Sequence, residues 1–203
     1  MNKKTHRIFA EILWRHLAEN YGIAINKIGF MLGNIAPDLT FSFVVHRHER
    51  AVASEHVRRG IARLVDGQMF EDFDAGFVLA ERLGSLCHYC ADFFCEAHTP
   101  RYQGNVREHY QYERALCDYV IANRETLRHR IKGPEIFLAA DCENIFERLL
   151  SMNDVYLAGS PTFAAQARGA LEACLMLVGT IMATRCYGSV DMSFEPAWAD
   201  SGQ

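Results

Sequence analysis

The stretch that decides both the fold and the site is LGSLCHYCADFFCEAHTPRYQGNVREHYQYE, residues 83–113. Five side chains able to bind a metal recur in it at helical spacing: His88, Asp92, His98, His109 and Glu113. Because residues i and i+4 lie on the same face of a helix, the first pair and the last pair each point to one side. Two neighbouring antiparallel helices would aim both pairs into one space, as helical bundles do when they build polynuclear metal sites.

A plainer interpretation is a helical bundle with scattered buried histidines, since a lone His-x-x-x-Glu on a helix is usually a solvated pair. The apolar setting argues against it, because Leu83, Leu86, Phe93 and Phe94 surround the first pair. A carboxylate buried there without a partner would be costly, and a cation removes that cost.

Composition narrows the class of protein. The chain has 203 residues, of which 50% are hydrophobic and 23% charged, as is usual for a globular protein with a real core. We expect one domain over 1–203 with an irregular tail at 191–203. The net charge of −4 argues against a broad basic surface for nucleic acid, but it does not exclude a nucleotide bound at a metal.

The N-terminus and the cysteines bear on the compartment. Charged residues interrupt every apolar run of the first twenty residues, so we expect no signal peptide, a mature chain that begins at Met1, and a cytoplasmic protein. Seven cysteines, an odd number, predict buried reduced thiols. Cys87-x-x-Cys90 has no second such motif and no strand-turn-helix context, so we expect it to have no chemical role.

Apolar periodicity predicts an all-α fold, because no alternation of period two persists. We expect about seven helices, over residues 4–20, 25–32, 51–64, 70–98, 106–130, 134–150 and 162–186, with Thr5 as the N-cap of the first. In the last helix, the uncharged run 173–184 is only about half of the roughly 20 residues that span a bilayer. We therefore expect a central core helix and no transmembrane segment.

The candidate ligands use imidazole or carboxylate groups and no thiolate, as catalytic zinc sites do: His6, Asp38, His48, His88, Asp92, His98, His109 and Glu113. In their order and spacing they resemble the zinc-dependent phospholipase C family, which is similar in fold and metal site to the S1/P1-type nucleases. The resemblance covers about the first 115 residues. It rests on His6, the GNIAPDL turn with Asp38, the segment 46–48, His-x3-Asp-x5-His and His-x3-Glu.

The resemblance implies a distribution of these residues over two or three zinc ions. One zinc would be bound by Asp38, His48, His88 and Asp92, a second by His98, His109 and Glu113, and a third by His6 and the bridging Asp92 carboxylate. In the family, the third zinc is completed by the amino group and carbonyl of a tryptophan exposed by processing. This chain begins with Met1, which leaves three alternatives: the Met1 amine substitutes, the site is dinuclear, or the third site is weak.

Some assignments stay open at this point. His48 is preferred over His46 for the first zinc, and His56 is less favoured; His16 and His129 are interpreted as solvent-facing. Asn34, Tyr89, Tyr110 and Tyr112 are candidates to support the ligands or to line the pocket.

The resemblance also implies a function: phosphodiester hydrolysis in which hydroxide formed at zinc attacks phosphorus and Asp38 serves as base or orients the nucleophile. The substrate would be a phospholipid headgroup or a small phosphodiester. Two alternatives are a nuclease or nucleotide phosphatase of the S1/P1 type, and a non-catalytic, metal-stabilised helical binding protein. The oligomeric state is not predicted.

Overall fold

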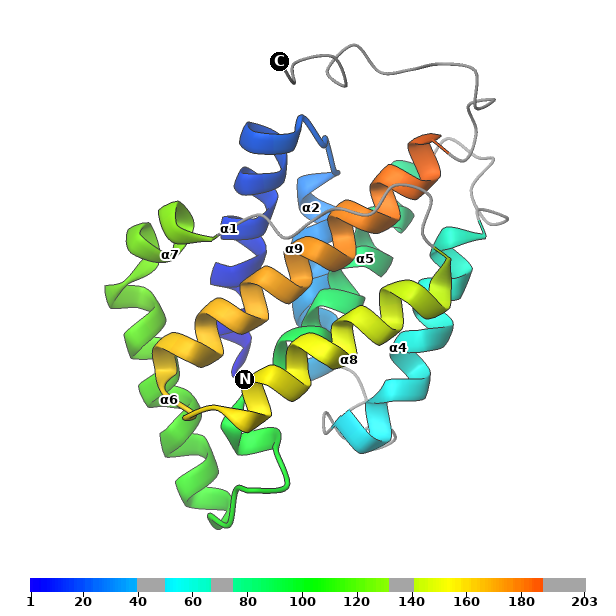
Figure 1. Cartoon of the computed structure of the whole chain (residues 1–203). Coiled ribbons are helices and arrows are strands. Elements are labelled where there is room, and N and C mark those ends of the chain that lie inside the picture. Colours follow the sequence, from blue (N-terminus) through cyan, green and yellow to red (C-terminus); the bar gives the residue numbers. More distant parts are fainter. Residues whose placement is uncertain (40–49, 67–74, 132–140, 188–203) are drawn as a thin grey trace, which may run out of the picture.

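The computed structural model describes residues 1–39, 50–66, 75–131 and 141–187, and within these ranges the chain is helical with no strand (Figure 1). This confirms the all-α prediction. The elements are α1 (Lys3–Tyr21), α2 (Lys27–Ile35), the 3-10 helix η1 (Ala36–Asp38), α4 (Arg50–Val65), α5 (Ala75–Asp92), the 3-10 helix η2 (Glu96–His98), α6 (Val106–Ala122), α7 (Arg124–Arg130), α8 (Cys142–Ala158) and α9 (Phe163–Tyr187).

Four predicted boundaries were wrong, and one of them is the end of the helix predicted over 134–150, which continues to Ala158. Helix α1 is capped by Asn2 rather than by Thr5, because the Asn2 side chain accepts a hydrogen bond from the Thr5 N–H at 3.0 Å. The helix predicted over 70–98 ends at Asp92, where N–H groups bond to carbonyls three residues back and tighten the last turn. The helix predicted over 106–130 is broken at Asn123, whose side chain donates to the Tyr119 carbonyl.

The central position of the last helix is confirmed. Helix α9 packs against α1, α4, α5, α6 and α8, and residues 173–178 in its middle are at most 1% exposed (Figure 1). The stretch Phe163–Arg185 is long and apolar enough to cross a membrane, yet 72% of its most apolar window is buried inside the protein. Neighbouring helices already cover this surface.

Helices α2 and α5 approach each other closely through glycines. A Cβ on Gly33 would lie 2.0 Å from the Glu81 carbonyl oxygen, and one on Gly84 would lie 2.3 Å from the Phe30 carbonyl oxygen. Only glycine permits contact at this distance, since a side chain would overlap backbone atoms. The contact brings η1, at the end of α2, beside the last turns of α5.

The chain between α5 and α6 is irregular but tightly held. The Asn153 side chain of α8 donates to the Phe93 carbonyl at 2.7 Å, and the Gln166 side chain of α9 accepts from the Glu96 N–H at 3.0 Å. Both side chains are fully buried. Residues 93–98, which include part of the predicted ligand motif, are therefore fixed by two helices far away in the sequence.

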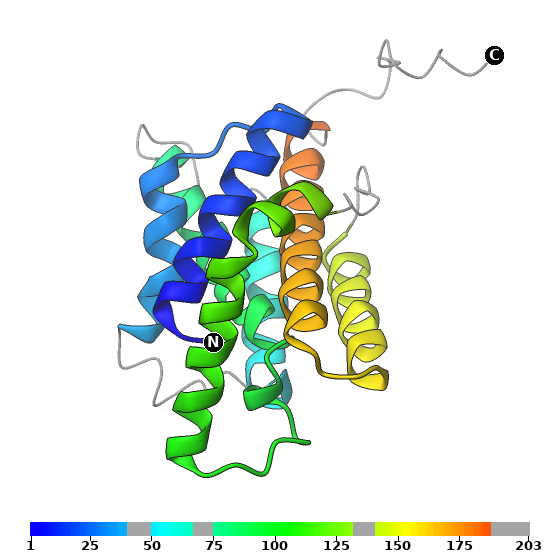
Figure 2. The ribbon, with the colours of Figure 1, turned by 90° about the vertical axis from the view of Figure 1, so that its left-hand side faces the viewer.

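The amino end of α1 lies between α5 and α6 and contacts both helices. Figure 2 shows the N-terminus beside α6. Asn2 anchors it there, because its side-chain amide donates to the Glu113 carbonyl at 3.2 Å. The two ligand pairs of the sequence thus meet across the start of α1.

Candidate metal centre

The first ligand pair lies at the end of α5, and both members are fully buried. His88 Nδ1 lies 2.9 Å from the Asn34 carbonyl oxygen, to which it donates. The lone pair of the neutral ring is therefore on Nε2, which lies 3.5 Å from Asp92 Oδ2 and 3.7 Å from Asp38 Oδ1. A backbone carbonyl that fixes the ring in this way is the usual support of a metal-binding histidine.

Asp92 joins the two halves of the centre. Its Oδ1 lies 3.3 Å from His6 Nε2 and 3.7 Å from His98 Nε2, and it also contacts the α-amino group of Met1. Its other oxygen faces His88. A carboxylate placed between two sets of donors is suited to bridging two cations.

The second ligand pair begins one turn into α6. The capping box of Asn105 and Glu108 starts this helix, and His109 Nε2 lies 3.2 Å from Glu113 Oε1 one turn later. His98 Nε2, from η2, lies 3.0 Å from the same oxygen. All three members of the predicted second set are thus brought together.

The α-amino group of Met1 lies inside this set, a position that the spacing of ligands did not reveal. It is 2.8 Å from His98 Nε2 and 3.2 Å from Glu113 Oε1, and it contacts Asp92. Burial would lower the pKa of this amine, but the charges of Asp92 and Glu113 outweigh burial and raise the pKa to about 12. Without a metal, an ammonium group therefore compensates the buried carboxylates.

The pKa values of Glu113 and His98 are both lowered, in contrast to the raised pKa of the Met1 amine. Burial would raise the pKa of Glu113, but hydrogen bonds from His109 and His98 and the charge of Met1 hold that pKa well below its usual range. Burial and the Met1 charge lower the pKa of His98. At neutral pH the centre therefore offers an ionised carboxylate and a neutral imidazole, which are the forms that bind metals.

Two features of this arrangement fit a bound cation. Within the described part of the chain, neither ring nitrogen of His6 has a hydrogen-bond partner, although the ring is fully buried and stacks on His88 at 3.9 Å. His98 Nε2 cannot both accept from the Met1 ammonium and donate to Glu113. A cation resolves both conflicts, because imidazole, carboxylate and neutral amine then all act as lone-pair donors.

Donor atoms cluster in two groups whose members lie within 4.8 Å of one another. The first is His6, Asp38 and His88, and the second is Cys95, His98 and Glu113. Cys95 was missed because the ligand set was expected to hold no thiolate. The signal was its position between Asp92 and His98, inside the motif itself.

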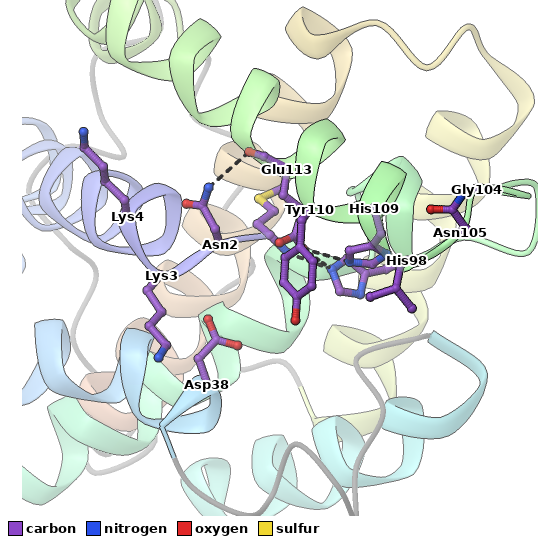
Figure 3. A pocket seen from close by; sticks show the side chains of 12 residues that line it. Asn2, Lys3, Lys4, Asp38, His98, Gly104, Asn105, His109, Tyr110 and Glu113 are labelled. Carbon is purple, nitrogen blue, oxygen red and sulfur yellow. Dashed lines mark hydrogen bonds and ion pairs between the residues drawn. The ribbon is translucent and has the colours of Figure 1, made fainter.

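The centre opens into a cavity of about 720 Å³. Figure 3 shows Glu113, His98 and His109 on one side of it and Asp38 on another, with the Lys3 side chain directed toward Asp38 and Lys4 directed away. The lining residues are Met1, Asn2, Lys3, Lys4, Asp38, His98, Gly104, Asn105, Val106, His109, Tyr110 and Glu113. Two cationic residues and four of the candidate ligands, Asp38, His98, His109 and Glu113, thus line one space large enough for a small molecule.

Comparison with known proteins identifies the family of the chain. The profile of the family described as zinc dependent phospholipase C matches residues 5–157, well over half of the chain. The chain belongs to this family. No curated protein and no solved structure matches the chain.

Family membership supports zinc as the metal, and the matched region contains every predicted ligand from His6 to Glu113. The prediction for His48, and its alternative His46, lies outside the described residues. His56 is half-buried on α4 with its ring 4.9 Å from Tyr89, and it belongs to neither donor group.

The remaining predictions have mixed outcomes. His129 is exposed as expected, whereas His16 is only 9% exposed and the expectation of a solvent-facing ring was wrong. Of the pocket candidates, Tyr110 lines the cavity, Asn34 supports His88 through its carbonyl, and Tyr112 bonds to Gln166. Five of the six cysteines with described side chains are buried thiols, in agreement with the prediction of reduced cysteines.

Proposed function

We propose that the protein is a zinc-dependent phosphodiester hydrolase of the phospholipase C type, which acts on a phospholipid headgroup or a smaller phosphodiester. The observation that carries the proposal is the convergence of donors from α1, η1, α5, η2 and α6 on one buried centre that opens into a cavity. A metal site serving only stability would be closed by its ligands. The adjoining cavity therefore supports an enzyme rather than a metal-stabilised binding protein.

We assign the ligands in agreement with the family resemblance. One zinc would be held by Asp38, His88 and Asp92, with a histidine of the segment 46–48, and another by His98, His109 and Glu113. His6 and the Met1 amine flank Asp92 Oδ1, so they are the donors for a third ion. Bound zinc would supply a Lewis acid for the phosphoryl oxygens and an acidified water.

The side chains around the cavity support the rest of the reaction. Asp38 is 12% exposed and lines the cavity, which supports its role as the base that takes a proton from the water attacking phosphorus. The bond from phosphorus to the leaving alcohol oxygen breaks, and that oxygen takes up a proton from solvent. Lys3, whose side chain is directed toward Asp38, provides positive charge for the phosphodiester at the same cavity (Figure 3).

The rim of the cavity supports an amphiphilic substrate. Val106 is 73% exposed and Tyr110 is 66% exposed, and both line the cavity beside His109. Exposed apolar side chains beside a charged site suit a molecule with a polar headgroup and an apolar part. An exposed tyrosine could also stack on a base, so nuclease activity is the alternative that the assay must separate.

The experiment is turnover by zinc-loaded protein of phospholipid vesicles, a chromogenic phosphodiester, single-stranded DNA and a nucleoside monophosphate. We expect hydrolysis of the first two and zinc in the purified protein. Asp92→Asn should lower the rate by more than the roughly 10- to 100-fold typical of changes outside the ligand set. The exposed Asp154→Asn on α8 is the control and should keep full activity. Zinc-free protein without turnover would refute the proposal, and turnover of DNA or the nucleotide alone would favour the nuclease alternative.

A further inference from the structure

Cys95 is a buried donor that the assignment above does not use. Its side chain is fully buried, and its sulfur lies within 4.8 Å of the donor atoms of both His98 and Glu113. We propose that Cys95 supplies a thiolate ligand to the cation held by His98 and Glu113. This inference rests on the proposed zinc centre and adds a sulfur donor to it.

The position of the thiol is set by the fold. Cys95 lies between the end of α5 and η2, where its N–H bonds to the Asp92 carbonyl at 3.0 Å and its own carbonyl accepts from the His98 N–H at 2.9 Å. Because Asn153 and Gln166 hold this segment from α8 and α9, the sulfur is oriented before any metal arrives, as ligands with supporting hydrogen bonds are.

Charge balance also favours a thiolate. The described candidate ligands include three carboxylates, Asp38, Asp92 and Glu113, whose three negative charges are fewer than the four positive charges of two divalent cations or the six of three. When zinc binds, the Cys95 thiol would release its proton to solvent and its sulfur would form the bond to the metal. The thiolate adds one negative charge inside a buried site, where uncompensated charge is costly.

A sulfur donor changes the metal preference of the site. Thiolates favour zinc and other soft ions, whereas carboxylates and carbonyls alone suit magnesium, calcium and manganese. Cys95 would therefore make the His98 and Glu113 position selective for zinc. Substituting it should weaken zinc binding there by more than the roughly 10- to 100-fold typical of residues outside the ligand set.

Cobalt(II) substitution tests the proposal without depending on activity. Cobalt bound to nitrogen and oxygen gives only visible ligand-field bands, whereas a thiolate adds a sulfur-to-cobalt charge-transfer band in the near ultraviolet. We expect this band in the cobalt-loaded protein and its loss in Cys95→Ser, with the visible bands retained. Cys117→Ser is the matched control, because Cys117 is 3% exposed, lies on α6 and belongs to neither donor group.

The outcomes separate this proposal from the proposed function. Visible bands without the charge-transfer band, or a band that survives in Cys95→Ser, would overturn the Cys95 assignment and leave the metal centre intact. Failure to bind cobalt or zinc at all would overturn both. X-ray absorption at the zinc edge of the unmodified protein needs no variant, and it should include a zinc–sulfur distance of about 2.3 Å; a spectrum with nitrogen and oxygen neighbours only would contradict the proposal.

Discussion

Asp92→Asn is the substitution that most directly separates the electrostatic role of the centre from its packing, because asparagine keeps the size of the side chain and removes its charge. Asp92 is fully buried, and its oxygens face the Met1 ammonium, His6, His88 and His98. Breaking a buried charge pair by removing one partner costs about 3–5 kcal/mol. We expect the lower end, about 3 kcal/mol, for the metal-free protein, because Glu113 remains 3.2 Å from the amine.

Zinc should amplify the difference between the two proteins. A ligand at 100 times its dissociation constant stabilises a folded protein by about 2.7 kcal/mol per site, so zinc should stabilise the unmodified protein by several kcal/mol and the variant by much less. The assay is urea unfolding followed by far-ultraviolet circular dichroism, in EDTA and in zinc. Asp154→Asn, a 63% exposed carboxylate paired with Arg50, is the control and should change little. Equal stability of Asp92→Asn and the unmodified protein in EDTA, with an equal gain in zinc, would refute the reasoning.

Three further predictions address the surroundings of the centre. The pKa of the Met1 amine is raised from 8.0 to about 12, so its contribution to the stability of the metal-free protein is complete below pH 8 and is lost as the pH rises toward 12; unfolding free energies over this window should fall, and N-terminally acetylated protein should lack that loss. Gly33→Ala should destabilise by about 1–3 kcal/mol, because the added Cβ would lie 2.0 Å from the Glu81 carbonyl oxygen, while Gly76→Ala, with nothing within 4 Å, should not destabilise in the same thermal melts. Asn153→Ala leaves a buried carbonyl between α5 and η2 without its donor, and it should cost about 1–3 kcal/mol in urea unfolding and loosen zinc binding in a chelator competition; unchanged values would show that α8 does not hold this segment.

The helical class and the relation within each ligand pair could be predicted from the sequence, because both depend on local periodicity. His109 and Glu113 lie on the same side of α6, because they are one turn apart on an uninterrupted stretch of this helix. The end of α5 could not be placed, because Phe93 and Phe94 continue the apolar pattern while their burial favours a turn there. The spacing of apolar residues does not show whether a buried apolar segment continues as a helix or turns.

The position of the Met1 amine, which the sequence left as one of three alternatives, and the missed donor Cys95 both depend on tertiary contacts. The Met1 amine reaches Asp92 because Asn2 caps α1 and also bonds to the Glu113 carbonyl, a pair of contacts that no spacing rule reveals. Cys95 lies inside the motif, but helical spacing excludes it, and only the irregular backbone after α5 turns its sulfur toward His98. Helical spacing therefore identifies donors that share one face of a helix, but it does not identify donors whose position depends on where a helix ends.

Anomalous diffraction at the zinc absorption edge, from crystals of protein purified without chelator, tests the central claim most directly. We expect two or three anomalous peaks at the centre, one within bonding distance of His88 Nε2 and one within bonding distance of both His98 Nε2 and Glu113. Crystals with no zinc at these atoms, and with the imidazoles of His88 and His98 hydrogen-bonded to protein groups or water instead, would contradict the proposed metal centre.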